Sequence, residues 1–264
     1  MCDVLQISRS TYYYKARERK SEDDVTNAII KIFKDNRSAY GTRKIKVELA
    51  KQGLVVSRRR IARIMKEQGL VSCYTVAQFK PQKETCNESK QANELNRAFK
   101  QETAKKAVVS DVTYVRVKNK WHYICVFVDL YNREIIGFST GEHKDQSLVA
   151  RAFSSIKGPL SDIQLFHTDR GNEFKNKLID DTLKTFAIQR SLSVKGCPYD
   201  NAVAEATFKT IKTEFVYQMT FDTLDELTVQ FSDYVNWFNK IRIHQTLGYV
   251  SPLQYKEIPL KKVV

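Results

Sequence analysis

The sequence has few of the residues that interrupt or cross-link a chain. Its 264 residues include 9 glycines, 5 prolines, 5 cysteines and 4 histidines. No apolar run approaches the ~20 residues that a membrane-spanning helix requires, and the first residues lack the charged and apolar regions of a secretory signal. The cysteines form no CxxC pair and the histidines no zinc-ligand spacing. We therefore expect a cytoplasmic protein without disulfides, zinc or a membrane span.

Positive charge is abundant and unevenly distributed. The formal net charge is +14, which favours a polyanionic partner. Residues 1–100 hold 22 Lys and Arg against 11 Asp and Glu, a net charge of +11, whereas residues 101–264 hold 22 against 19, a net charge of +3. The N-terminal part is therefore the better candidate for binding phosphates. A basic surface that only confers solubility is the alternative.

Residues 1–70 are predicted to form a helical domain. Helices are expected over 21–36, 40–52 and 57–69, with Gly53 and Gly69 ending the last two. Two short helices joined by a glycine-containing turn are typical of a helix-turn-helix, whose second helix enters the major groove or only contacts phosphates. A basic hairpin packed on another domain is the alternative. The candidate DNA contacts are the basic residues of this pair: Arg43, Lys44, Arg58, Arg59, Arg60 and Arg63.

A polar stretch over 71–103 is predicted to be a linker, with a short helix over 91–100 at most.

From residue 107 onwards, apolar residues recur at every second position. This alternation predicts strands over 108–117, 121–129 and 134–140, and the gaps between them are short enough for hairpins. Short apolar segments predict two further strands over 163–168 and 188–192. Helices are expected over 145–156, 172–186 and 198–215, and from residue 222 onwards.

The order of these elements defines an α/β fold with a mixed five-stranded sheet, three strands antiparallel and two parallel, flanked by helices. We assign a core to residues 104–220. A C-terminal helix and tail over 221–264 is expected to pack on that core or extend it. The first and fourth strands are predicted to be neighbours at the centre of the sheet.

Three acidic residues occupy special positions in this order. Asp111 interrupts a strand of β-branched residues, and such violations of local propensity gather at functional sites. Asp169 follows the fourth strand beside a glycine turn, where α/β sheets build sites. Glu205 shares one helix face with Lys209 and Lys212. Neighbouring first and fourth strands would bring the aspartates together beneath Glu205; an ordinary surface helix with a weak Glu–Lys pair is the alternative.

Converging carboxylates repel one another unless cations lie between them, and hard divalent ions such as Mg²⁺ take oxygen ligands. Two such ions about 3.5–4 Å apart stabilise both oxygens of an in-line phosphoryl displacement. Asp111, Asp169 and Glu205 are therefore candidate catalytic residues and metal ligands, and Lys209 and Lys212 candidate contacts to the DNA backbone. The competing acids are Asp129, Glu173, Asp200 and Glu214. Asp129 ends a strand, Glu173 lies near a helix start, and Asp200 shares a capping role with Asn201.

The spacing of these residues resembles a known signature. Asp169 and Glu205 are separated by 35 residues, and Lys212 follows Glu205 by seven. This pattern is similar to the DDE signature of retroviral-type integrases and bacterial transposases, whose cores are ribonuclease-H-like. The motifs are closer still to the OrfB product of the insertion-sequence-3 family. They cover nearly the whole chain: Tyr40-Gly-Thr-Arg43 to Gly69-Leu70, Asp111-Val-Thr-Tyr-Val115, Val128–Gly137, His167-Thr-Asp-Arg-Gly171, Asp200-Asn-Ala202, Lys212-Thr-Glu214 and Asn239–Pro252.

The resemblance implies transposition of a mobile element, in which metal-dependent 3′-end cleavage is followed by strand transfer into target DNA, with Mg²⁺ or Mn²⁺. It implies double-stranded DNA and further copies of this chain as partners, an upstream-frame (OrfA) partner or fusion, and association with the nucleoid. Two alternatives stay open. One is a catalytically inactive DNA-binding transposase subunit or remnant. The other is a nuclease acting on RNA–DNA hybrids, against which the arginine-rich N-terminal unit argues.

Overall fold

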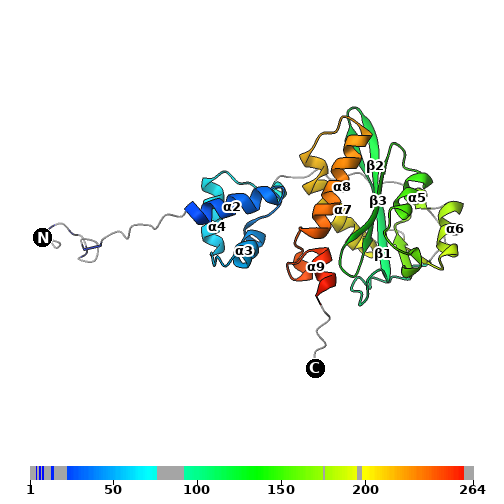
Figure 1. Cartoon of the computed structure of the whole chain (residues 1–264), viewed down its shortest axis with the longest axis horizontal. Coiled ribbons are helices and arrows are strands. Elements are labelled where there is room, and N and C mark those ends of the chain that lie inside the picture. The colour runs from blue at the N-terminus through cyan, green and yellow to red at the C-terminus, as the bar shows by residue number, and fades with distance from the viewer. Residues whose placement is uncertain are drawn as a thin grey trace, which may run out of the picture. The chain divides into compact units, whose positions relative to one another are not determined.

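A computed structural model describes residues 23–75, 92–174, 176–194 and 198–258, together with residues 4, 6, 8, 13 and 14 (Figure 1). The chain divides into two compact units, Met1–Val71 and Ser72–Val264, and each is described by itself. The expected start of the first helix at residue 21, and residues 76–91 of the expected linker, lie outside the described residues.

In unit 1, the described residues form a small helical domain. Its helices are α2 (Asp23–Asp35), α3 (Thr42–Lys51) and α4 (Arg58–Glu67). Each of the three packs on the other two, because their apolar residues fall on one face: Ile29, Ile32, Phe33, Ile45, Leu49, Ile61 and Ile64 are all buried. Gly53 and Gly69 follow α3 and α4 with φ of 78° and 65°, the left-handed conformation that ends helices. The predicted helix-turn-helix is therefore formed by α3 and α4.

Unit 2 is built on one five-stranded sheet in the order β3-β2-β1-β4-β5. β1 pairs with β2 and β2 with β3 in antiparallel fashion, whereas β4 pairs in parallel with both β1 and β5. The predicted sheet, including the neighbouring first and fourth strands, is confirmed. The strands are β1 (Ala107–Val117), β2 (Lys120–Asp129), β3 (Ile135–Gly141), β4 (Leu165–Thr168) and β5 (Gln189–Leu192).

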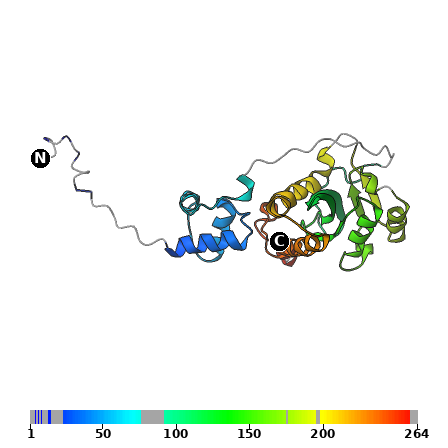
Figure 2. The same cartoon turned by 90° about the horizontal axis from the view of Figure 1, so that it is seen from above.

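Helices cover both faces of this sheet (Figures 1 and 2). α5 (Gln146–Ser154) packs on β2 and β3, with α6 (Lys177–Thr185) beside it. On the opposite face, α7 (Ala202–Glu214) packs on β1 and α8 (Leu224–Lys240) on β3. Among the described residues, no helix is long and apolar enough to cross a membrane.

The structure corrects two expectations in this unit. Residues 92–100 form bends, turns and irregular chain rather than a helix, because Leu95 is buried and its N–H donates to Ser191 Oγ at 3.1 Å. The predicted helix over 172–186 is divided into the single turn η3 (Asn172–Phe174) and α6. The Asn176 side chain accepts from the Ile179 N–H at 2.9 Å and starts α6 there.

The start of α7 also differs from expectation. Neither Asp200 nor Asn201 caps it with a side-chain hydrogen bond. The buried Asp200 carboxylate instead accepts from Arg97 Nε at 2.7 Å and from the Val194 N–H at 3.0 Å. Desolvation opposes ionisation of this group, but these two hydrogen bonds hold the pKa of Asp200 below its usual range. Asp200 therefore ties the end of β5 to the segment that precedes β1.

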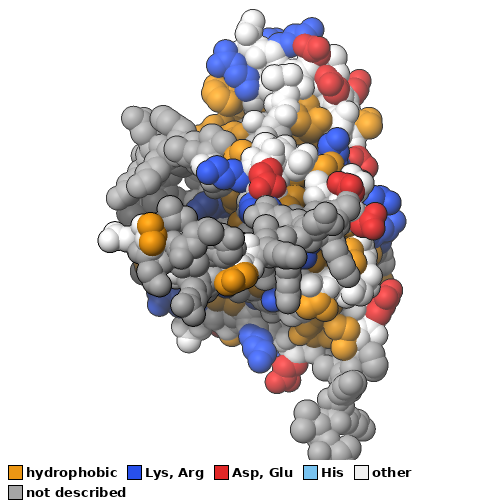
Figure 3. All heavy atoms as spheres, turned by 90° about the vertical axis from the view of Figure 1, so that its left-hand side faces the viewer, with side chains coloured by type: hydrophobic (Ala, Val, Ile, Leu, Met, Phe, Trp, Pro, Cys, Tyr) orange, Lys and Arg blue, Asp and Glu red, His pale blue; other side chains and the backbone are white. Residues whose placement is uncertain are grey.

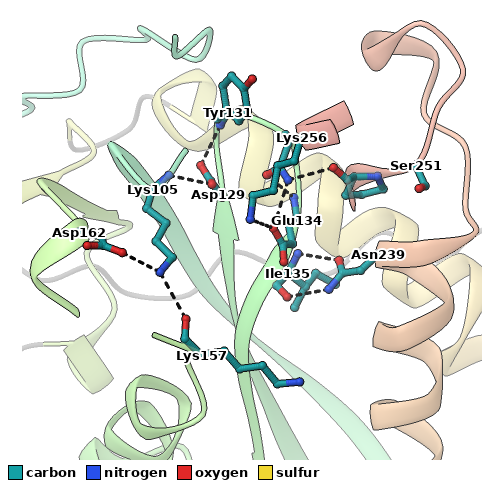
Figure 4. Close-up of polar contacts among 12 residues, drawn as sticks. Lys105, Asp129, Tyr131, Glu134, Ile135, Lys157, Asp162, Asn239, Ser251 and Lys256 are labelled. Carbon is teal, nitrogen blue, oxygen red and sulfur yellow. Dashed lines mark hydrogen bonds and ion pairs between the residues drawn. The ribbon is translucent and has the colours of Figure 1, made fainter. Parts of the chain in front are cut away.

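The C-terminal residues pack on the same sheet (Figure 4). The Asn239 amide in α8 makes two 2.9 Å hydrogen bonds with the backbone of Ile135 in β3. α9 (Pro252–Glu257) follows a capping box at Ser251. Its Lys256 pairs with Glu134 at 2.5 Å, and Asp129 accepts from the backbone of Lys105 and Tyr131. Asp129 therefore has the structural role predicted for it.

A buried ion pair joins the end of α7 to the segment after α8. Arg242 donates to both carboxylate oxygens of Glu214, at 2.7 Å from Nε and 2.9 Å from Nη2. Two tyrosine hydroxyls complete the set: Tyr234 in α8 at 3.1 Å, and Tyr74 in the short turn η1 (Cys73–Thr75) at 2.6 Å. The side chains of Glu214 and Arg242 are 0% and 8% exposed. Four segments of unit 2 are therefore joined at one carboxylate.

Replacing Arg242 with Met is expected to lower the free energy of unfolding of unit 2 by about 3–5 kcal/mol, because Glu214 is left as an unpaired buried charge. The matched control is Lys256→Met, which breaks a surface pair and is expected to cost at most about 1 kcal/mol. Urea unfolding followed by circular dichroism measures both. Equal effects of the two substitutions would show that the buried pair is not a main stabilising interaction.

Candidate active site

The parallel pairing of β1 and β4 brings Asp111 and Asp169 to the same level of the sheet. The last paired residues are Ser110 and Thr168, and the next residues along the two chains are Asp111 and Asp169. Side chains level with each other on neighbouring strands point to the same face, so the pairing predicts two carboxylates side by side. The Asp169 turn is held by its own hydrogen bond, since the Gly171 N–H donates to Asp169 Oδ1 at 3.0 Å.

The two aspartates interact electrostatically. Desolvation, followed by the charge of Asp169, raises the pKa of Asp111 to about 8. The Val112 N–H donates to Asp111 Oδ1 at 2.8 Å and acts in the opposite direction. A carboxyl whose ionisation is opposed by burial and by a like charge is typical of a site that binds a cation.

Glu205 approaches the pair from α7. The helix carries an apolar stripe of four buried residues: Ala204, Phe208, Ile211 and Phe215. This stripe holds α7 against the sheet and leaves Glu205 exposed. Desolvation, and then the charge of Asp169, raises the pKa of Glu205. The charges of Glu205 and Asp169 therefore interact, while the pairing of β1 with β4 places Asp111 beside Asp169.

Lys212 lies seven residues further along α7 and reaches the same region. It is half-buried; desolvation lowers the pKa of Lys212, and the negative charge of Asp111 opposes that shift. Lys209 is exposed on the same helix. The ammonium group of Lys212 therefore already interacts with Asp111, while that of Lys209 lies at the surface of the same helix.

Sequence reasoning gave Glu173 only a structural role, but this carboxylate interacts electrostatically with both aspartates. Glu173 lies in η3, not in the first turn of α6, and is 6% exposed. Lys144 pairs with it at 3.3 Å. Desolvation raises the pKa of Glu173, Lys144 lowers it, and Asp169 raises it. Its position four residues after Asp169 was the available signal, but the expected continuous helix would have directed Glu173 elsewhere.

His167 supports the Asp169 turn from behind. Its ring nitrogens contact Ser191 Oγ at 2.8 Å and Ser193 Oγ at 3.1 Å across β5. Burial lowers the pKa of His167 to about 4, so the ring is neutral at physiological pH. The two serine contacts therefore orient the ring behind the Asp169 turn.

The chemistry of the donor set fits hard divalent cations. As they stand, no three His, Cys, Asp or Glu side chains among the described residues are grouped tightly enough to hold a metal ion. The carboxylates of Asp111, Asp169 and Glu205 nevertheless supply only oxygen ligands, and the first and third have pKa values raised by a neighbouring acid. A bound cation would remove that repulsion.

The basic residues predicted to contact DNA lie on α3 and α4 of unit 1. Arg43, Arg58 and Arg59 are exposed. The other three are partly buried: Lys44 lies 4.7 Å from the Tyr40 ring centroid, Arg63 pairs with Glu67 at 3.4 Å, and Arg60 follows in the first turn of α4. On the face drawn in Figure 3, Lys and Arg side chains are interspersed with acidic and hydrophobic ones.

The first turn of α4 is electrostatically unusual. Ser57 caps it by accepting from the Arg60 N–H at 3.3 Å, yet three arginines follow at the positive end of the helix dipole, which disfavours cations. An anion placed at this end would be favoured by both the arginines and the dipole. The arrangement therefore fits a phosphate-binding helix start.

Models of known protein families match three segments of the chain. An HTH-like domain matches residues 20–77, and integrase core domains match residues 102–198 and 205–260. The chain is 31% identical over 266 residues to the insertion element IS600 uncharacterized 31 kDa protein of Shigella sonnei, covering 97% of both chains. It is 28% identical to the putative transposase InsK for insertion sequence element IS150 of Escherichia coli (strain K12), covering 96% of this chain and 91% of that one.

Solved structures show weaker likeness. A simian T-cell lymphotropic virus intasome, in complex with PP2A regulatory subunit B56 gamma, superimposes with a TM-score of 0.49 and 14% identity over 88% of this chain and 76% of that one. The HTLV-2 integrase catalytic core domain in complex with magnesium gives a TM-score of 0.44 and 16% identity over 58% and 97%.

Together, the sheet topology and the integrase core models define a ribonuclease-H-like polynucleotidyl transferase of the DDE type, a class that generally uses divalent metal ions. The chain belongs to the insertion-sequence transposases, the family that includes the transposases of the insertion-sequence-3 elements. The predicted resemblance is thereby confirmed. HTH-like and integrase domains both indicate DNA as the partner.

In the absence of metal, Asp111→Asn is expected to raise the thermal midpoint at pH 8. The folded-state pKa of Asp111 is raised, so the folded protein holds this proton more tightly than the unfolded chain, and stability is lost as pH rises from about 4 towards about 8. The amide of the variant does not ionise, so the variant does not lose this stability. The difference in thermal midpoint between variant and wild type should therefore shrink towards pH 4.

Thermal unfolding in EDTA across this pH range measures the effect. Asp145→Asn is the control with opposite sign. The pKa of Asp145 is lowered, chiefly by its cap hydrogen bond from the Leu148 N–H, so this variant should be less stable than wild type at pH 8. A lower midpoint for Asp111→Asn at pH 8 would show that Asp111 is not repelled in the folded protein.

Proposed function

We propose that Asp111, Asp169 and Glu205 are the catalytic carboxylates of this transposase and the ligands of two Mg²⁺ or Mn²⁺ ions. The observation that carries the proposal is the pairing of β1 with β4, which stops one residue before each aspartate. The raised pKa of Glu205, to which the charge of Asp169 contributes, supports its membership of the same site. Glu173 is already paired with Lys144 and has a supporting role.

The proposed reaction is cleavage at the 3′ ends of the element, followed by transfer of the 3′-hydroxyl to target DNA. Divalent cations held by the three carboxylates would neutralise the charge on the attacking and leaving oxygens of each in-line displacement. Lys212, which already faces Asp111, holds the scissile phosphate from the α7 side. Lys209 contacts the backbone further along the strand. His167 is neutral and keeps the Asp169 turn in position.

Unit 1 is proposed to bind double-stranded DNA at the element ends. Arg58, Arg59, Arg60 and Arg63 of α4, with Arg43 and Lys44 of α3, would contact phosphates or base edges. In this division, residues 1–70 bind DNA, 71–103 link, 104–220 form the catalytic core and 221–264 complete it. Homo-oligomers on paired ends, an upstream-frame (OrfA) partner or fusion, and a cytoplasmic, nucleoid-associated location belong to the same proposal.

Asp169→Asn is expected to abolish Mg²⁺-dependent strand transfer, because one oxygen ligand and its charge are removed, while DNA binding stays within about twofold of wild type. The assay joins labelled element ends, taken from the repeats flanking the coding region, to a plasmid target. The control is Asp181→Asn on the exposed face of α6, which should retain activity.

Mg²⁺ should also raise the thermal midpoint of wild type and not that of Asp169→Asn. Unchanged joining by Asp169→Asn would refute the assignment, and an inactive wild type that still binds element ends would favour the non-catalytic DNA-binding subunit.

The double substitution Arg58→Ala with Arg59→Ala is expected to weaken binding to an element-end duplex and to reduce the slope of log K against log salt by roughly 2, about one unit for each phosphate that is no longer neutralised. Fluorescence anisotropy between 50 and 300 mM salt, about the range in which such slopes are measured, gives both quantities. Lys31→Ala with Lys34→Ala removes the same charge from the exposed face of α2 and should leave the slope closer to wild type. Identical slopes for the two double variants would show that α4 does not contact phosphates.

A further inference from the structure

Aromatic side chains are exposed together near the hairpin that joins β1 and β2. Tyr114 on β1 is 38% exposed, and Trp121 on β2 and Tyr217, just after α7, are each 52% exposed. Tyr114 alternates along β1 with the buried residues Thr113 and Val115, so its side chain points to the opposite face of the strand from theirs. We call Tyr114, Arg116, Trp121 and Tyr217 the hairpin surface.

The members of the hairpin surface contact one another. The rings of Tyr114 and Trp121 meet edge to face, with centroids 5.1 Å apart and an interplanar angle of 84°. The Arg116 guanidinium lies 5.7 Å from the Trp121 ring centroid. Desolvation, and then the nearby Tyr114, raises the pKa of Tyr217. The aromatic groups therefore form one platform rather than isolated exposed residues.

The positive charge of this region favours a polyanionic partner. The hairpin sequence over 112–123 contains Arg116, Lys118 and Lys120 and no acidic residue. At the other side of the platform, Lys212 Nζ lies 5.1 Å from the Tyr114 ring centroid. Flat exposed rings interleaved with cations are what a nucleic-acid strand requires, because bases stack on the rings and phosphates pair with the cations.

We propose that the hairpin surface stacks the unpaired bases of a DNA strand next to the carboxylate site. The inference rests on the proposed function and deepens it. Tyr114 and Asp111 point to opposite faces of β1, but Lys212 lies near both, and β4 leaves the edge of β1 beyond Ser110 unpaired. A strand bound on the platform would cross this edge to reach the carboxylates. Bases within an intact duplex are already stacked and paired. The platform therefore fits a strand whose bases are separated close to the position of cleavage.

The experiment compares two single strands of equal length, an oligo-dT and an abasic strand with the same phosphates, binding to the full chain in EDTA. The chain has two tryptophans, and Trp237 is 5% exposed, so quenching by bases reports Trp121. Oligo-dT is expected to quench the tryptophan emission and to bind roughly tenfold or more tightly than the abasic strand, the size expected for one stacked base.

Trp121→Ala is expected to remove that preference while leaving abasic binding unchanged, and Trp121→Phe to keep most of it. The control is Phe186→Ala, which removes another exposed aromatic after α6, 38% exposed, and should keep the full preference. Equal binding of the two strands to wild type, or an undiminished preference in Trp121→Ala, would overturn the inference. Strand transfer with Mg²⁺ is measured separately, so a failure of the catalytic assignment would not alter the readout in EDTA.

Discussion

The parallel pairing of β1 with β4 is the constraint on which the site depends. β1 continues for seven residues beyond Ser110, its last partner on β4, whereas β4 ends at Thr168. The free edge of β1 therefore begins at Asp111, and the chain turns away at Asp169. A shift of one residue would send one carboxylate to the opposite face. The antiparallel partner β2 fixes the register of β1 along its full length, and His167, anchored on β5, fixes the turn after β4.

Carboxylates gathered in this way repel one another, so the surrounding structure must hold them in place. The apolar stripe of α7 keeps Glu205 at the site while its other end is fixed by Glu214 and Arg242. That buried pair includes Tyr74, which lies just after unit 1 along the chain. The segment that leaves the helix-turn-helix unit is therefore attached to the helix that carries Glu205. Stability from the ion pair and apolar packing offsets the electrostatic cost at the site, as is common where function requires like charges together.

Much of this arrangement could be predicted because it is local or follows from connectivity. Alternating residues specify β1 to β3, and the helix between β4 and β5 makes a parallel pair the natural outcome. Asp111 stands out because a strand of β-branched residues has no other reason to contain it. What could not be predicted depends on contacts distant in sequence. Glu173 lies beside the aspartates because the chain makes a single turn, η3, before α6. Asp200 does not cap α7 because it accepts a hydrogen bond from Arg97, 103 residues away in the sequence. Buried Leu95 likewise replaces an expected helix.

The distribution of charge indicates how the two units divide their work. Residues 1–100 carry most of the excess positive charge, including the arginines at the start of α4 that oppose the helix dipole and gain from a phosphate. The carboxylate site alone would repel DNA. It becomes able to accept a phosphate only when cations offset its charge, and Lys212 offsets only part of it. In the proposed function, unit 1 therefore attracts the DNA, and unit 2 accepts one of its phosphates. Under the proposed function, the long-ranged attraction by unit 1 would hold DNA before it is cut, because acceptance of a phosphate by unit 2 requires the carboxylates to be neutralised by metal.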